Sequence, residues 1–168
     1  MKKAIFVCLL IFGFCCHSQN NIQLSLQQDF RLFFFGDKKG NDPLTLNFLS
    51  RIEIPVYNLK NTHIVASASV EYADLIEKDY KRYALGAGYI VHRFYGKIGG
   101  GAYIDFGEIY RENEGFYSFS ISGEINYKIS ERLKIIFTSQ LTQRKDLSVL
   151  YNSKGYLISG FFGLKFSL

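Results

Sequence analysis

Histidine is the side chain that most often acts in acid–base catalysis or activates a nucleophile, so the histidines are the first candidates for catalytic residues in this chain. Beyond residue 20 the chain has two histidines, His63 and His92, and each flanks a short polar turn. Neither lies beside a serine or carboxylate in a catalytic spacing, and two isolated histidines do not make a metal site, which needs three or four close ligands. The sequence therefore predicts no catalytic residue, no metal site and no cofactor.

Thiol and phosphate chemistry are excluded in a similar way. All three cysteines, Cys8, Cys15 and Cys16, lie within the first 18 residues, which are expected to be removed as a signal peptide, so the mature chain would contain no thiol. The three glycines at 99–101 have no helix after them to complete a phosphate cradle, and they fit a strand bend or close strand packing instead. The formal charge of +5 is spread along the chain without a basic cluster, so no nucleic-acid partner is expected.

The remaining charged side chains follow an alternating pattern. From Tyr156 to the end of the chain, every second residue is apolar or glycine, and the residues between include Ser159, Gly163 and Lys165. A period of two is the signature of a β-strand with two different faces. The polar faces of the alternating segments carry five acidic and five basic residues: Asp29, Arg31, Arg51, Glu53, Glu71, Arg82, Asp105, Glu124, Lys134 and Lys165.

Eight segments of this kind position those residues. They span 22–35, 44–57, 63–73, 82–92, 97–108, 116–128, 133–142 and 156–168. Each has about 10 to 14 residues, which is near the length that a tilted strand needs to cross a bilayer. The connections after the odd-numbered segments are longer and charged, and those between them are short. This asymmetry favours an all-β fold, an eight-stranded antiparallel up-and-down transmembrane β-barrel with both termini at the short-turn end.

The polar face decides between a membrane barrel and a soluble one. A lipocalin-like carrier would place its apolar residues inside, and its polar outer face would be rich in long lysines and glutamates. Here the polar face mixes small residues with balanced charges, which fits the narrow interior of an eight-stranded barrel. The ten charges are therefore predicted to form a lumen network that plugs the barrel. Within it, Lys165 is expected to pair with Asp29 on the adjoining first strand.

The first residues predict a secretory signal peptide. Met1-Lys2-Lys3 is basic, residues 4–14 are apolar and too short to span a bilayer, and Ser18 ends a short polar stretch. Residues 1–18 are expected to be removed, which leaves residues 19–168 as one barrel domain.

The end of the chain carries a resemblance to a known family. The pattern Phe162-x-Leu164-x-Phe166-x-Leu168 is similar to the signal that the outer-membrane insertion machinery reads, although the last residue is leucine where phenylalanine is usual. With its eight segments the chain resembles the small outer-membrane barrels of Gram-negative bacteria, OmpX-like or like the OmpA transmembrane domain. The resemblance implies a cell outer membrane location. It also implies membrane lipids, lipopolysaccharide and the insertion machinery as partners; the sequence does not determine the oligomeric state, and a monomer is expected.

The main functional hypothesis is a non-enzymatic barrel that acts through its external loops, at 36–43, 74–81, 109–115 and 143–155. In the last of these, Arg144, Lys145, Tyr151 and Lys154 are the predicted surface contacts for lipopolysaccharide phosphates or another protein. The alternatives are a lipid A-modifying enzyme, since some small barrels have that activity, and a soluble ligand carrier. An enzyme of this kind would need a histidine near the outer leaflet, whereas His63 and His92 are expected at the opposite end.

Overall fold

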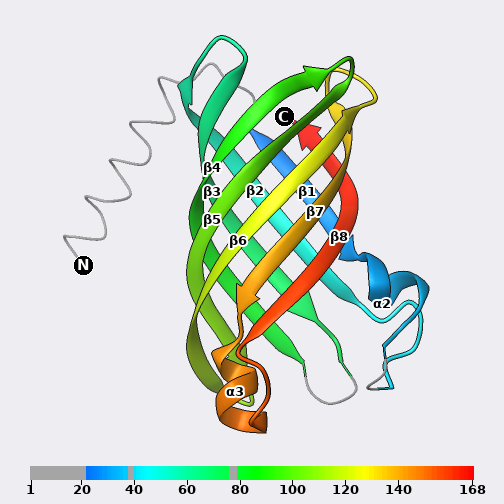
Figure 1. Cartoon of the computed structure of the whole chain (residues 1–168), viewed down its shortest axis with the longest axis vertical. Coiled ribbons are helices and arrows are strands. Elements are labelled where there is room, and N and C mark those ends of the chain that lie inside the picture. Colours follow the sequence, from blue (N-terminus) through cyan, green and yellow to red (C-terminus); the bar gives the residue numbers. More distant parts are fainter. Residues whose placement is uncertain (1–21, 38–39, 76–78) are drawn as a thin grey trace, which may run out of the picture.

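The alternating segments form a closed barrel in which each strand pairs with its neighbours in the chain and β1 pairs with β8 (Figure 1). The computed structural model describes residues 22–37, 40–75 and 79–168, so the predicted signal peptide lies outside the described residues. In the described part, the eight strands are β1 (Gln23–Asp29), β2 (Asn47–Asn58), β3 (Thr62–Ala73), β4 (Tyr80–Tyr95), β5 (Ile98–Arg111), β6 (Glu114–Lys128), β7 (Leu133–Gln143) and β8 (Tyr156–Ser167).

The barrel is polar inside and apolar outside, as the alternation predicts. Leu85 and Ile158 each leave 71% of their surface exposed, although both lie within strands. Their chain neighbours Ala84 and Ser159 are buried. A soluble protein rarely exposes a continuous apolar belt of this kind, whereas a barrel in a bilayer requires it. The predicted fold class is confirmed.

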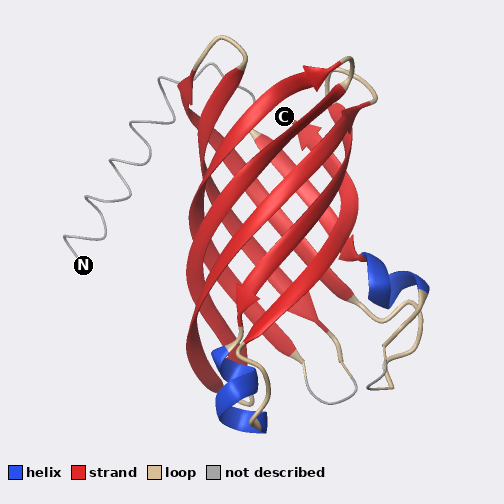
Figure 2. Ribbon diagram, viewed as in Figure 1, coloured by secondary structure: helices blue, strands red, loops and turns tan. Residues whose placement is uncertain are grey.

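Two short helices lie at the end of the barrel that also carries its longer connections (Figure 2). They are α2 (Phe30–Phe34) and α3 (Lys145–Tyr151). Within the described residues no helix is long and apolar enough to cross a membrane. The opposite end, where the chain terminus Leu168 lies, has the brief turns at 59–61, 96–97 and 129–132. These are named below the helix end and the short-turn end.

The first strand is shorter than predicted. β1 ends at Asp29 because this side chain accepts a hydrogen bond of 2.9 Å from the Leu32 backbone N–H, which caps α2. The phenylalanines of the helix then pack outside the barrel against Phe162 of β8, with ring centroids of Phe30 and Phe33 at 6.0 and 5.5 Å from it. Because every residue from 32 to 35 is apolar, the sequence does not show where the period of two of the strand gives way to the helix.

The external connection predicted at 109–115 is wrong in extent. β5 continues to Arg111 and β6 begins at Glu114, so only a two-residue turn joins them. Glu112 and Asn113 adopt φ angles of 53° and 67°, the left-handed conformation of a tight hairpin turn that asparagine tolerates well. Only the connections after β1, β3 and β7 are long enough to form a surface at the helix end.

Close backbone approach closes the ring between β1 and β8. Gly163 of β8 lies opposite Gln27 of β1. A side chain built at Gly163 would meet the Leu26 carbonyl oxygen at 2.0 Å and the Gln27 Cα at 2.6 Å. Glycine is therefore required at this point of the closing seam.

Candidate functional site

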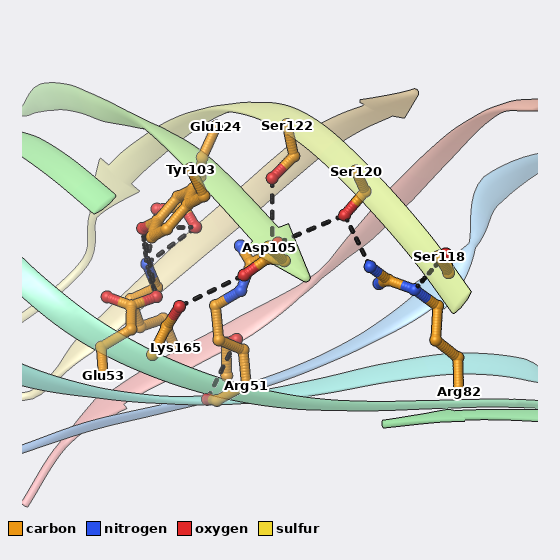
Figure 3. A network of polar contacts seen from close by, with 12 residues as sticks. Arg51, Glu53, Arg82, Tyr103, Asp105, Ser118, Ser120, Ser122, Glu124 and Lys165 are labelled. Atoms are coloured by element: carbon orange, nitrogen blue, oxygen red, sulfur yellow. Dashed lines mark hydrogen bonds and ion pairs between the residues drawn. The ribbon is translucent and has the colours of Figure 1, made fainter. Parts of the chain in front are cut away.

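The interior of the barrel is crossed by ion pairs that centre on Lys165 of β8 (Figure 3). Its Nζ lies 2.8 Å from a Glu53 carboxylate oxygen and 2.6 Å from a Glu124 carboxylate oxygen. It also donates to the Tyr103 hydroxyl at 3.1 Å. Glu53 and Glu124 come from β2 and β6, which are four strands apart in the ring, so these bonds span the lumen.

This arrangement corrects the predicted partner of Lys165. The lysine does point inward, but it pairs with Glu53 and Glu124 and not with Asp29. In the β1–β8 register Lys165 lies opposite Ser25, and Asp29 lies opposite Phe161, four pairs of residues further along. Asp29 instead caps α2 and accepts a hydrogen bond from Asn47 at 3.4 Å.

A second ion pair lies next to the first. The Arg51 guanidinium of β2 binds the Asp105 carboxylate of β5 at 3.0 Å, and it stacks on the Tyr103 ring at 4.1 Å from the centroid. Asp105 also accepts hydrogen bonds from Ser67 at 3.2 Å and Ser120 at 3.4 Å. Tyr103 therefore contacts both cations, although it is not one of the ten residues predicted for the lumen network.

The network extends to Arg82 through serines. Arg82 donates to the hydroxyls of Ser118 at 3.0 Å and Ser120 at 2.9 Å, and Ser120 in turn bonds Asp105. The small inner residues thus leave room for long cations and also supply their acceptors. Glu71, directly opposite Arg82 in the β3–β4 register, accepts a hydrogen bond from Tyr80.

The ten predicted lumen charges therefore separate into groups. Arg51, Glu53, Arg82, Asp105, Glu124 and Lys165 form the connected network. Asp29 and Glu71 are buried toward the helix end, and Lys134 is buried toward the short-turn end. Arg31 is a correction, because the turn of α2 takes it out of the strand period and leaves it exposed at the rim.

Apolar residues on the inner face form packed layers between the polar ones. Four inward-facing positions hold large apolar residues where the pattern elsewhere has polar ones. They are Leu49, Ile90, Ile136 and Phe161, and each is at most 1% exposed. These side chains add apolar contacts to the interior at several levels along the barrel.

A second charged cluster lies at the helix end, and it corrects the prediction for Arg144. This residue was expected at the surface, but it is buried and binds the Asp146 carboxylate through two hydrogen bonds of 2.9 and 2.8 Å. Arg111 lies 3.2 Å from the same carboxylate. Both guanidinium groups lie over the Tyr80 ring, at 4.1 Å for Arg144 and 5.3 Å for Arg111.

The electrostatics of this cluster keep Arg144 charged. Burial alone would lower the pKa of Arg144, but the hydrogen bonds to Asp146 and the attraction of Tyr80, Asp146 and Glu71 together outweigh that effect and hold the pKa above its ordinary value. One carboxylate thus serves two buried cations. Asp146, Arg111 and Tyr80 were not identified from the sequence, because a charged residue in a loop is more often solvated than buried.

The other predicted surface residues do face solvent. Lys145, Tyr151 and Lys154 are exposed on and after α3, and the Tyr151 hydroxyl donates to Glu112 of the β5–β6 turn. A pocket of about 800 Å³ at the helix end lies between the connection after α2 and the Arg111–Arg144 cluster. Leu32, Leu75 and Leu147 contribute to its largely apolar lining.

The histidines meet at the short-turn end. His63 Nδ1 and His92 Nε2 are 2.7 Å apart, in a hydrogen bond that joins β3 to β4. In the described part of the chain, neither imidazole bonds a serine or a carboxylate, and no group of three or more potential metal ligands occurs. The nucleophile–base–orienting-group arrangement of a hydrolase or acyltransferase is not formed around this pair.

Comparison with known proteins bears on the fold. No family model matches the chain, and no curated protein matches it in sequence. Among solved structures, the outer membrane protein Ail of Yersinia pestis is 13% identical with a TM-score of 0.55, over 89% of this chain and 100% of Ail. Neisserial surface protein A is 12% identical with a TM-score of 0.53, over 90% of this chain and 98% of that protein.

The fold and the apolar exterior together define the class of protein. The chain is an eight-stranded transmembrane β-barrel of the outer-membrane type. Within that class it shares the course of its backbone with Ail and with Neisserial surface protein A, at a level of identity that establishes the fold alone.

Proposed function

We propose that this protein is a non-enzymatic outer-membrane barrel whose closed lumen makes it an anchor, and that it acts by presenting a contact surface at the helix end. The observation that carries the proposal is Lys165, which links Glu53 and Glu124 from opposite walls of the barrel. A pore would need a continuous water path, and eight strands leave an interior that side chains can fill.

The pairing of charges inside the barrel is a second argument for a closed lumen. Each cation of the central network has a carboxylate or serine partner, and the inner apolar residues Leu49 and Phe161 are fully buried. An ion-selective pore would instead present charges to water along its length. The soluble-carrier alternative is disfavoured, because most of the large apolar side chains of this barrel lie outside it.

The closure of the lumen is tested by conductance. The purified barrel, reconstituted in a planar bilayer, is expected to give no steady open-channel current, because ion pairs and packed apolar layers fill its interior. The same preparation should shift its mobility on a gel after boiling, as a folded membrane barrel does. A reproducible steady current from the unboiled protein, removed by Lys165→Arg but not by Lys60→Arg, would contradict the closed lumen.

The contact surface is proposed on α3 and the residues that follow it, with Lys145, Tyr151 and Lys154 as its exposed members. Lysine ammonium groups bind phosphate as point charges, and tyrosine contributes apolar area together with a hydroxyl. Lipopolysaccharide, whose lipid A carries phosphates in the outer leaflet, is the partner that this chemistry fits at the helix end.

This surface predicts a charge-dependent interaction. Replacing both Lys145 and Lys154 by glutamine is expected to weaken binding of purified lipopolysaccharide by about tenfold, since each lost charge-assisted contact contributes roughly 0.5–1 kcal/mol at an exposed site. Binding is measured by titration of the detergent-solubilised barrel at fixed ionic strength. The matched control replaces Lys60 and Arg132, which are exposed at the short-turn end. Equal weakening in the control would reduce the effect to net charge and contradict the proposed surface.

A further inference from the structure

Three lysines lie in a row on neighbouring strands near the short-turn end. In the register of the barrel, Lys128 of β6 is directly opposite Lys134 of β7, and Lys134 is directly opposite Lys165 of β8. Like charges that face each other across strands are destabilising unless anions separate them. The position of carboxylates along this row therefore determines which lysine is free to bind an external anion.

The two outer lysines have carboxylate partners. Lys165 binds Glu53 and Glu124, and Lys128 binds Glu131 at 2.7 Å. Lys134, in the middle, makes no hydrogen bond or close ion pair with any residue that the structure describes, although it lies within the electrostatic reach of Glu53 and Glu124, which are bound to Lys165. It is nevertheless only 9% exposed. An ammonium group in this position has few ways to reach water and no close carboxylate of its own, so an anion beside it would be stabilised.

Lys134 also lines a pocket that opens at the short-turn end and holds about 620 Å³. Arg93, Lys97 and Lys128 add further cations to its wall, and His92 lies among them. Among the described lining residues Glu131 is the one carboxylate, and it is already bound to Lys128.

We propose that this pocket binds a phosphate dianion, with Lys134 at its floor and Arg93, Lys97 and Lys128 at its rim. The excess of cations over carboxylates favours a doubly charged ligand over a singly charged one. The several oxygens of phosphate can accept from the floor and the rim together, and such charge-assisted bonds are about twice as strong as neutral ones. The site lies at the opposite end of the barrel from the proposed contact surface and does not depend on it.

The experiment is a titration of the isotope-labelled barrel with inorganic phosphate in a non-ionic detergent, at ionic strength held constant with sodium chloride. Saturable shifts are expected in the backbone amide signals of Lys97, Lys128 and Lys134. The variant Lys134→Gln should weaken binding at least about tenfold, because a lost hydrogen bond to a charged group costs roughly 1.5–3 kcal/mol. Lys97→Gln on the exposed rim provides a second variant if the first does not fold.

Two controls separate this site from alternatives. Lys60→Gln removes an exposed lysine at the same end that does not line the pocket, and it should leave phosphate binding unchanged. Glycerophosphoglycerol, a singly charged phosphodiester like a lipid headgroup, should bind at least several-fold more weakly than phosphate. Shifts that rise linearly without saturation, equal loss in the Lys60 variant, or equal affinity for the diester would each overturn the proposal.

Discussion

Lys165→Met is expected to destabilise the folded barrel by about 3–5 kcal/mol, the range for removing one partner of a buried ion pair. The methionine keeps most of the volume but leaves Glu53 and Glu124 close together without a cation. Both carboxylates are buried, so water cannot take over the role of the ammonium group. The free energy of unfolding is measured by urea titration of the barrel in lipid vesicles, followed by the shift in gel mobility.

The control for this effect is the triple variant Lys165→Met, Glu53→Gln, Glu124→Gln. Removing all three charges should recover most of the lost stability, because replacing a whole buried ionic group with neutral residues is often close to neutral. Lys154→Met, in the exposed connection between α3 and β8, should change stability by less than about 0.5 kcal/mol. If the triple variant is no more stable than the single one, packing and not charge explains the loss.

The partners of Lys165 illustrate where prediction from the sequence ends. That the lysine faces the lumen follows from a period of two in β8, and Glu53 and Glu124 face it for the same reason. Which inward residues then meet across the lumen depends on the stagger of the strands around the barrel. No sequence pattern in one strand contains that stagger, and the adjoining Asp29 was therefore the wrong choice.

The two helices could not be predicted from the sequence for a different reason. Asp29 is a good N-cap residue, but Phe30 and Phe33 to Phe35 satisfy a strand pattern and a helix pattern equally well. In the last connection, Arg144, Lys145 and Asp146 are three consecutive charged residues that look alike in a sequence. The structure buries the first and the third and exposes the second, because only the first and third reach Tyr80 and Arg111.

The buried position of Asp146 between two arginines predicts a large effect for the substitution Asp146→Asn. The change keeps the shape of the side chain but leaves Arg111 and Arg144 as two buried cations over the Tyr80 ring with no carboxylate between them. We expect α3 to detach locally, at a cost of about 3 kcal/mol, while the strand pairs of the barrel stay intact. Hydrogen exchange of the α3 amides should accelerate by about a hundredfold, and chymotrypsin should cleave the connection between β7 and β8 faster.

The matched variants make this result specific to the shared carboxylate. Arg144→Ala leaves Asp146 paired with Arg111, so its effect on α3 exchange should be clearly smaller than that of Asp146→Asn. Lys145→Gln alters an exposed neighbour and should leave both exchange and chymotrypsin cleavage unchanged. Since α3 carries the proposed contact surface, Asp146→Asn should also weaken lipopolysaccharide binding although it removes a negative charge. Tighter binding in that variant would mean that net charge, and not the shape that Asp146 gives to α3, controls the interaction.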